Sequence, residues 1–198
     1  MGALGNRPEA PFWSVGTNRE NGRSSAMSGR RSGVSLGRRS GRQQPFPKST
    51  IVWGVELTHR ALAVETYNAA WSLLERPRDQ AEDRDLLGLA LASRYHWGQC
   101  GGARERAIAD WMVSRCCAAL GEGPLALLFA HAAMTDASDM APWLRASLYE
   151  GLARAAAVAG DRLLRAENMA AAHAALAEEP DGEAHSLILA QIEDVPPV

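Results

Sequence analysis

Cysteine is scarce in this sequence, and its spacing does not suit cross-linking. The 198 residues include three cysteines, Cys100, Cys116 and Cys117, of which two are adjacent. An odd number of thiols with an adjacent pair does not make a disulfide framework, so we expect a chain that folds in a reducing cytoplasm. No paired CxxC spacing is present, and free cysteine usually behaves as a small buried hydrophobe.

Long apolar runs and catalytic signatures are absent as well. No stretch reaches the ~18 apolar residues that a membrane helix needs, and the N-terminal region lacks the apolar segment of a secretory signal. The sequence contains no glycine-rich phosphate loop, no nucleophile elbow and no HExxH motif. We therefore predict no catalytic residue, no metal ligand and no cofactor, and we favour a binding protein over an enzyme.

Charge is divided unevenly along the chain. Residues 1–50 hold nine Arg or Lys side chains against two glutamates, whereas the remainder holds 12 basic and 21 acidic side chains. The first part is also rich in Gly, Ser and Pro, so it cannot bury enough apolar surface to offset the entropy of ordering it. We predict a disordered basic tail over residues 1–54 and a folded domain over 55–195. Alternatively, translation starts later, for example at Met27.

Apolar side chains recur at helical spacing from residue 58 onward, and Pro and Gly occur mainly in the loops between these segments. Pro77 is expected to end the first helix, because proline lacks an amide hydrogen and clashes with the preceding turn. No segment in this part alternates between apolar and polar residues for long enough to form a strand. Residues 52–55 are too few to count as one. The pattern predicts an all-α fold whose seven helices cover residues 58–75, 81–99, 103–120, 124–137, 142–160, 162–178 and 183–193.

The predicted helices form pairs with a repeat. Short joints require neighbouring helices to lie antiparallel. Gly121 and Gly160 each end a helix, and they lie 39 residues apart. A period of about 35–45 residues with two helices per unit is typical of a helical solenoid. The sequence therefore predicts stacked antiparallel helix pairs, with an irregular helical bundle as the alternative.

Small residues at the expected helix contacts add a family resemblance. Small residues stand in the second and third pairs at Ala126, Ala130, Ala133, Ala153, Gly160 and Ala166, and the larger Tyr149 and Leu152 occupy further matching positions in the third pair. Over residues 103–178, and by extension 58–178, the chain resembles the tetratricopeptide repeat family, which uses such residues for close helix packing. It is similar to uncharacterised bacterial members. The period is longer than that of the family, and Ser114 replaces a small Gly or Ala. The resemblance implies a short α-solenoid.

The glycine alignment also predicts a binding site. It places Arg115 over Arg154 and Trp111 over Glu150. In a solenoid both arginines would point into the concave groove, where guanidinium groups bind carboxylates by paired hydrogen bonds. Trp111, one turn before Arg115, would serve as an aromatic anchor. Alternatively, Arg154 pairs with Glu150 at i, i+4 on a solvated face and Trp111 is a core residue.

Three functions remain open from the sequence. The first is a protein–protein interaction or scaffold module that binds a peptide or partner helix in its concave groove. The second is a metal-binding or enzymatic helical protein that uses His96 and Cys100, one turn apart, together with Cys116 and Cys117. The third is nucleic-acid association through residues 1–50, because clustered arginines displace counterions from phosphate. We expect no membrane partner.

Overall fold

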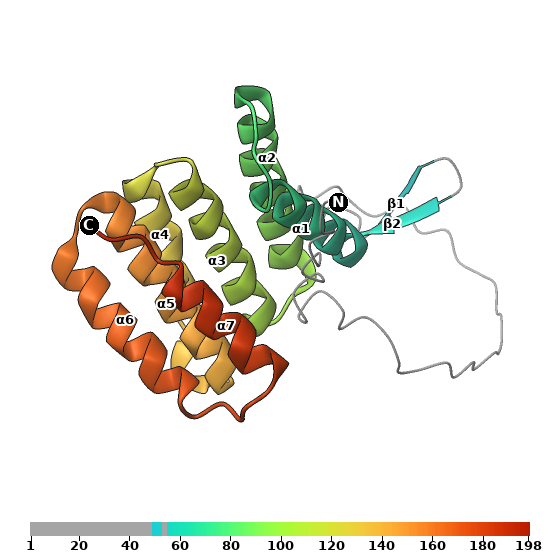
Figure 1. Ribbon diagram of the computed structural model, residues 1–198. Helices are drawn as coiled ribbons and strands as arrows, with labels where there is room; N and C mark the ends of the chain where they lie inside the picture. Colours follow the sequence, from blue (N-terminus) through green and yellow to red (C-terminus); the bar gives the residue numbers. More distant parts are fainter. Residues whose placement is uncertain (1–48, 53–54) are drawn as a thin grey trace, which may run out of the picture. The chain divides into compact units, whose positions relative to one another are not determined.

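The computed structural model describes residues 49–52 and 55–198 (Figure 1). They belong to a compact unit that spans residues 48–198. The predicted tail 1–54 lies outside the described residues except for 49–52. The elements in chain order are β1 (Ser49–Val52), β2 (Val55–Thr58), α1 (His59–Leu74), α2 (Gln80–Cys100), α3 (Ala103–Ala119), α4 (Gly123–Ala133), the 3₁₀ helix η2 (Ala137–Asp139), α5 (Pro142–Ala159), α6 (Arg162–Leu176) and α7 (Glu183–Glu193).

A short β-hairpin precedes the helices, and the sequence pattern did not predict it. Strands β1 and β2 pair antiparallel, with Ser49 opposite Thr58 and Val52 opposite Val55. The chain passes from β2 directly into α1, where the Thr58 side chain accepts a hydrogen bond from the amide of Ala61 at 3.1 Å. Thr58 thus satisfies one of the free amides at the start of α1.

The seven α-helices begin and end within a few residues of the predicted positions, because local signals define them. Asp79 starts α2 with a capping box, in which its side chain accepts from the amide of Glu82 and the Glu82 side chain accepts from the amide of Asp79. Gly121 and Gly160 have positive φ angles of 78° and 81°, a conformation that glycine adopts without strain. Both glycines therefore end helices as predicted.

The fourth helix is shorter than predicted. It was expected to reach residue 137, but α4 ends at Ala133 and the chain then tightens into η2. The amide of Met134 bonds to the carbonyl oxygen of His131, three residues back, and the hydroxyl of Thr135 donates to the carbonyl oxygen of Ala132. These i→i+3 bonds and the competing hydroxyl replace the α-helical pattern.

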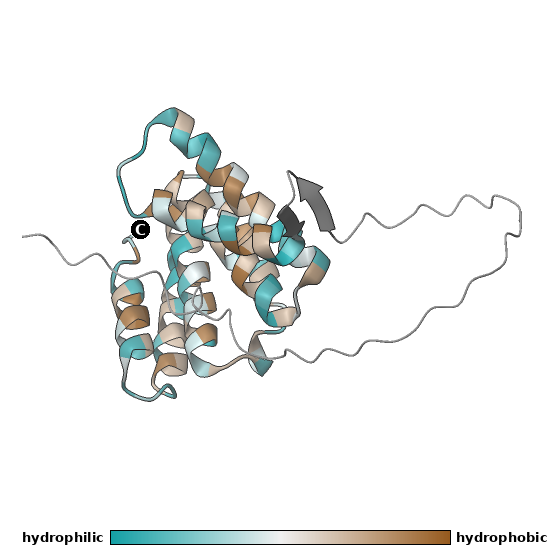
Figure 2. Cartoon of the chain, turned by 90° about the vertical axis from the view of Figure 1, so that its right-hand side faces the viewer, coloured by the Kyte–Doolittle hydropathy of each residue, from teal (hydrophilic) through white to brown (hydrophobic). Residues whose placement is uncertain are grey.

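Adjacent helices pack as pairs, α1 with α2, α3 with α4, and α5 with α6 (Figure 1). Each pair is joined by a short turn, which makes its helices antiparallel. The helices that open successive pairs also contact one another, since α3 packs against both α1 and α5, and α7 packs against α5. Brown and teal residues share the same helices in Figure 2, as expected when each helix turns one side to its neighbours.

The core is rich in alanine, which allows the helices to approach closely. In α5 the side chains of Ala146, Ala153, Ala155 and Ala156 have no solvent exposure. One close approach lies between α4 and α5, where a Cβ atom added to Gly123 would lie 2.7 Å from the Cα atom of Ala159. Only glycine fits at that position without a shift of the backbone.

Candidate functional site

A completely buried carboxylate lies at the centre of the helical unit. Glu150 stands in the middle of α5, on the side that packs against α3, and its side chain has no solvent exposure. A buried charge is stable only when it is paired and hydrogen-bonded. The partners of Glu150 therefore determine what this part of the molecule can do.

The structure brings the four predicted site residues together around that carboxylate. Arg154 donates from Nε to Oε1 of Glu150 at 2.6 Å, and Arg115 donates from Nη1 to the same oxygen at 3.1 Å. Trp111 donates from Nε1 to Oε2 at 3.4 Å. The predicted i, i+4 pairing of Glu150 with Arg154 is present. Its predicted location on a solvated face is wrong, because α3 covers Glu150.

A fifth residue, Trp71 of α1, completes the cluster. Its ring stacks against that of Trp111, with centroids 5.9 Å apart. The guanidinium carbon of Arg115 lies 5.4 Å from the ring centroid of Trp71 and 5.5 Å from that of Trp111, within the range of cation–π attraction. The sequence pattern did not select Trp71, since nothing local indicates the contact between α1 and α3.

The two arginines differ in how fully their donors are used. Arg154 donates to Glu150, to the carbonyl oxygen of Gln191 at 3.0 Å, and to the carbonyl and carboxylate oxygens of Asp194 at 3.3 Å each. Arg115, by contrast, reaches a single acceptor among the described residues, Oε1 of Glu150. A guanidinium has five N–H donors. Arg115 therefore keeps donors that a ligand could use.

Arg115 is held in a poorly solvated environment. Its side chain is 16% exposed. Burial lowers its pKa, the carboxylate of Glu150 raises it, and the neighbouring charge of Arg154 lowers it. A guanidinium nevertheless stays protonated at neutral pH. Arg115 and Arg154 thus face the buried carboxylate of Glu150, and the exposed carboxylate of Asp194 pairs with Arg154 as well.

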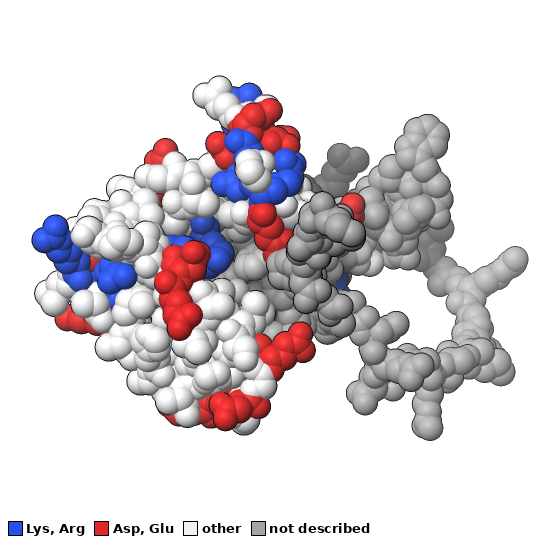
Figure 3. All heavy atoms as spheres, in the orientation of Figure 1, with Lys and Arg blue, Asp and Glu red and all other residues white. Residues whose placement is uncertain are grey.

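A small cavity lies beside these arginines. It has a volume of about 230 Å³, enough for one side chain rather than a drug-sized ligand. Its walls combine apolar and charged residues from α1, α3, α5 and the segment after α7: Leu74, Arg115, Ala118, Ala119, Arg154, Val158, Asp194 and Pro196. Basic and acidic atoms adjoin one another near the end of α7 in Figure 3, while most of the described surface in that view carries no charge.

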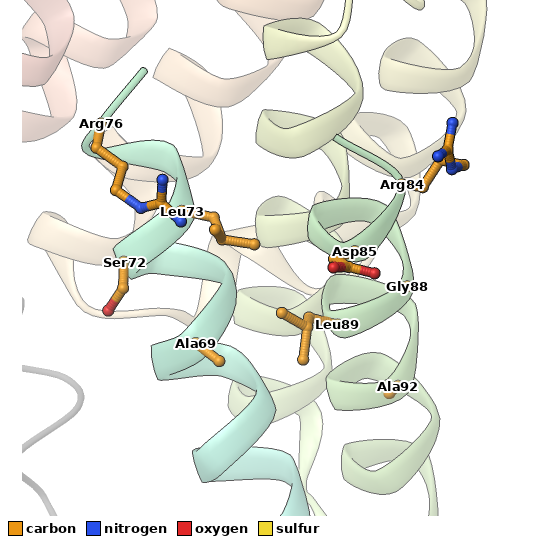
Figure 4. A pocket seen from close by; sticks show the side chains of 9 residues that line it. All are labelled: Ala69, Ser72, Leu73, Arg76, Arg84, Asp85, Gly88, Leu89 and Ala92. Atoms are coloured by element: carbon orange, nitrogen blue, oxygen red, sulfur yellow. The ribbon is translucent and has the colours of Figure 1, made fainter. Parts of the chain in front are cut away.

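A larger and more open hollow of about 650 Å³ lies between α1 and α2. Leu73 and Leu89 point toward one another across it from the two helices, and Arg76, Arg84 and Asp85 stand toward one end (Figure 4). Gly88 also lines it. This hollow has no buried charged group in its wall. Its lining therefore does not indicate the chemistry of a ligand. The Arg115 cavity is the better-defined candidate.

The residues of the metal-binding alternative do not assemble. His96 contacts His59, with their Nδ1 atoms 2.7 Å apart, while the thiol of Cys100 donates to the carbonyl oxygen of His96. Burial raises the pKa of Cys116 to about 12 and that of Cys117 to about 11, so both remain thiols at neutral pH. Within the described part of the chain, no three or more His, Cys, Asp or Glu side chains are arranged to hold a metal ion.

The partial burial of His96 beside His59 makes stability depend on pH. Burial, and secondarily the charge of His59, lower the pKa of His96 below its ordinary 6.5. Because the unfolded chain then binds the proton more readily, this contribution to stability is present above pH 6.5 and is lost as the pH falls below it. We expect the Tm to fall between pH 7 and pH 5 and expect His96→Asn to reduce that fall. Calorimetric melting curves at each pH measure the effect.

The exposed His131 provides the control for this experiment. A His131→Asn variant should keep the pH dependence of the wild type. If His96→Asn and His131→Asn give the same dependence, the histidine pair is not the cause, and the carboxylates account for the acid loss of stability.

Comparison with known proteins identifies no relative. No protein-family model matches the chain, no curated protein shows detectable similarity to it, and no solved structure matches its fold. Among the helices described, none combines the length and hydrophobicity needed to cross a bilayer.

Proposed function

We propose that the helical unit is a protein-interaction module that binds an acidic peptide segment of a partner protein at the Arg115 cavity. The observation that carries the proposal is that Arg115 is mostly buried and flanked by two tryptophans, yet has donors left over beside a cavity. Guanidinium groups bind carboxylates by paired, charge-assisted hydrogen bonds. The apolar wall that includes Leu74 and Val158 would accept the aliphatic part of a bound side chain.

Binding suits this cluster better than proton transfer does. Arginine stays charged over the whole physiological pH range, so Arg115 and Arg154 can hold an anion but are poor acids or bases. Glu150 has no exposure to solvent and already accepts hydrogen bonds from three side chains. A carboxylate engaged in this way serves to position the arginines.

We further propose that the helix pairs form a short tetratricopeptide-like α-solenoid. The contacts of α3 with α1 and α5, and of α5 with α7, support this arrangement, because in a solenoid the first helices of successive pairs line one side. The equivalent left-handed conformations of Gly121 and Gly160 support the repeat. In such an arrangement Arg115 and Arg154 occupy equivalent positions in successive units.

A peptide titration tests the binding proposal. The probe is a fluorescein-labelled peptide, acetyl-Glu-Ala-Glu-Ala-Glu-Ala-amide with the dye on an added lysine, and its anisotropy is followed as protein is added. We expect saturable binding that weakens with added salt. Arg115→Gln should weaken binding by about tenfold or more, because it removes the charge and the paired donors. The tryptophan emission should also change on binding, since Trp71 and Trp111 flank Arg115.

Matched variants separate a loss of binding from a loss of structure. Arg162→Gln removes an exposed arginine at the start of α6 and should leave the affinity unchanged. Arg115→Lys keeps the charge and should bind with intermediate affinity. Circular dichroism establishes that each variant is helical. Equal affinity for wild type and a folded Arg115→Gln variant would refute the proposal.

A further inference from the structure

The segment that follows α7 is itself held like a bound peptide. Arg154 of α5 donates from Nη1 to the carbonyl and carboxylate oxygens of Asp194, at 3.3 Å each. Arg165 of α6 donates from Nε to the carbonyl oxygen of Pro196 at 2.7 Å and from Nη2 to that of Val195 at 3.4 Å. Two arginines from neighbouring helices thus bind one carboxylate and three backbone carbonyl oxygens of residues 194–196. This segment begins at the last turn of α7, where the amides of Asp194 and Val195 bond to carbonyl oxygens of that helix.

The middle residue of this segment fills an apolar site. Val195 is 5% exposed and packs with Ala153 and Ala157 of α5, with Met169 of α6 beside them. Alanine side chains leave room on the helix surface, so a branched aliphatic side chain fits between α5 and α6. An anchored side chain between fixed backbone contacts is how proteins commonly bind extended peptides.

The sequence requirements of this docking are simple. Asp194 supplies the carboxylate, Val195 the aliphatic anchor, and Pro196 a carbonyl acceptor without an amide hydrogen that would need its own partner. Pro196 and Asp194 also line the Arg115 cavity, so the segment borders the space beside the unused donors of Arg115. The segment 194–196 therefore adjoins the proposed ligand site and shares Arg154 with it.

We infer that the partner carries a segment of the same chemistry, an acidic residue followed by an aliphatic residue and proline, which competes with residues 194–196 for Arg154, Arg165 and the Val195 site. This inference rests on the proposed function and specifies its ligand. The side chain of Asp194 is 72% exposed, which leaves its ion pair with Arg154 screened by solvent. Residues 194–196 are covalently linked to the site that they occupy, so their effective concentration there is high. They therefore compete with any external peptide and lower its apparent affinity.

The test uses the full chain and a labelled copy of its own segment. The probe is fluorescein-Glu-Asp-Val-Pro-Pro-Val-amide, which repeats residues 193–198. The release variant Asp194→Ala/Val195→Ser weakens the internal docking. It should bind the probe about tenfold or more tightly than the wild type does. Adding Arg165→Ala to the release variant should abolish this gain, because Arg165 holds the carbonyls of Val195 and Pro196.

The outcomes separate this inference from the proposed function. A release variant that is helical by circular dichroism and binds the Glu-Ala peptide, but not the probe, overturns the inference and leaves the proposed function standing. Equal binding of a scrambled probe, or equal affinity in wild type and release variant, overturns the inference as well. Asp194→Asn changes only an exposed side chain, and it serves as the milder variant if the double substitution unfolds the chain. Asp194→Asn should tighten probe binding about threefold. Unchanged affinity in this variant would overturn the inference.

Discussion

Replacing Glu150 with glutamine is expected to lower the free energy of unfolding by about 3 kcal/mol or more. Glutamine keeps the shape of the side chain and one acceptor oxygen but removes the negative charge. Arg115 and Arg154 then face each other without the carboxylate that both contact. Removing the negative partner of a buried ion pair leaves the positive charges of the arginines unpaired. The free-energy cost of these unpaired charges exceeds that of the lost hydrogen bonds. Urea unfolding followed by circular dichroism measures the change.

Glu178 provides the matched control for this substitution. It pairs with Arg145 at 2.5 Å, but its side chain is 60% exposed. Glu178→Gln should therefore cost less than about 1 kcal/mol, as surface ion pairs do. If Glu150→Gln and Glu178→Gln have similar effects, the buried cluster does not contribute to stability as its geometry implies.

Substituting Gly151 with alanine is the second change with a large expected effect. An added Cβ atom would lie 2.5 Å from Cδ1 and 2.9 Å from Nε1 of Trp111. Trp111 is 3% exposed and stacks on Trp71, so it cannot move aside freely. We expect a loss of about 2–3 kcal/mol from overpacking, even though alanine favours the helix. Thermal and urea unfolding report the loss.

The same substitution at Gly88 should have the opposite sign. Gly88 lies inside α2, and an added Cβ atom there would meet no atom within 4 Å. Gly88→Ala is expected to raise the free energy of unfolding by about 0.5–1 kcal/mol through helix propensity alone. Unchanged stability on Gly151→Ala would contradict the packing described around Trp111, and destabilisation by Gly88→Ala would contradict the open space described around Gly88.

The helices could be predicted because their signals are local. Asp79 with Glu82 begins α2 and Gly160 ends α5, and each acts through hydrogen bonds within a few residues. The end of α4 was predicted less well, because the choice between α-helical and 3₁₀ bonding after Ala133 depends on small differences in backbone geometry. The β1–β2 hairpin was missed, since two strands of four residues leave too few positions for a periodic pattern.

The candidate site could be predicted only in part. Aligning Gly121 with Gly160 selected Trp111, Arg115, Glu150 and Arg154, and the structure brings these four together. Neither the burial of Glu150 nor the contribution of Trp71 was predictable in this way. The docking of residues 194–196 was not predicted either, since its arginines lie about 30–40 residues away in sequence.

Local signals in the sequence specify where the helices begin and end and which side of each is apolar, because capping and periodic burial act over one or two turns. The packing of whole helices places Glu150 inside the unit, with Arg115 and Trp111 brought to it from 35 and 39 residues away. It also decides which arginine keeps donors for a ligand. Side chains far apart in sequence meet only when whole helices pack, and short-range pattern does not specify that packing.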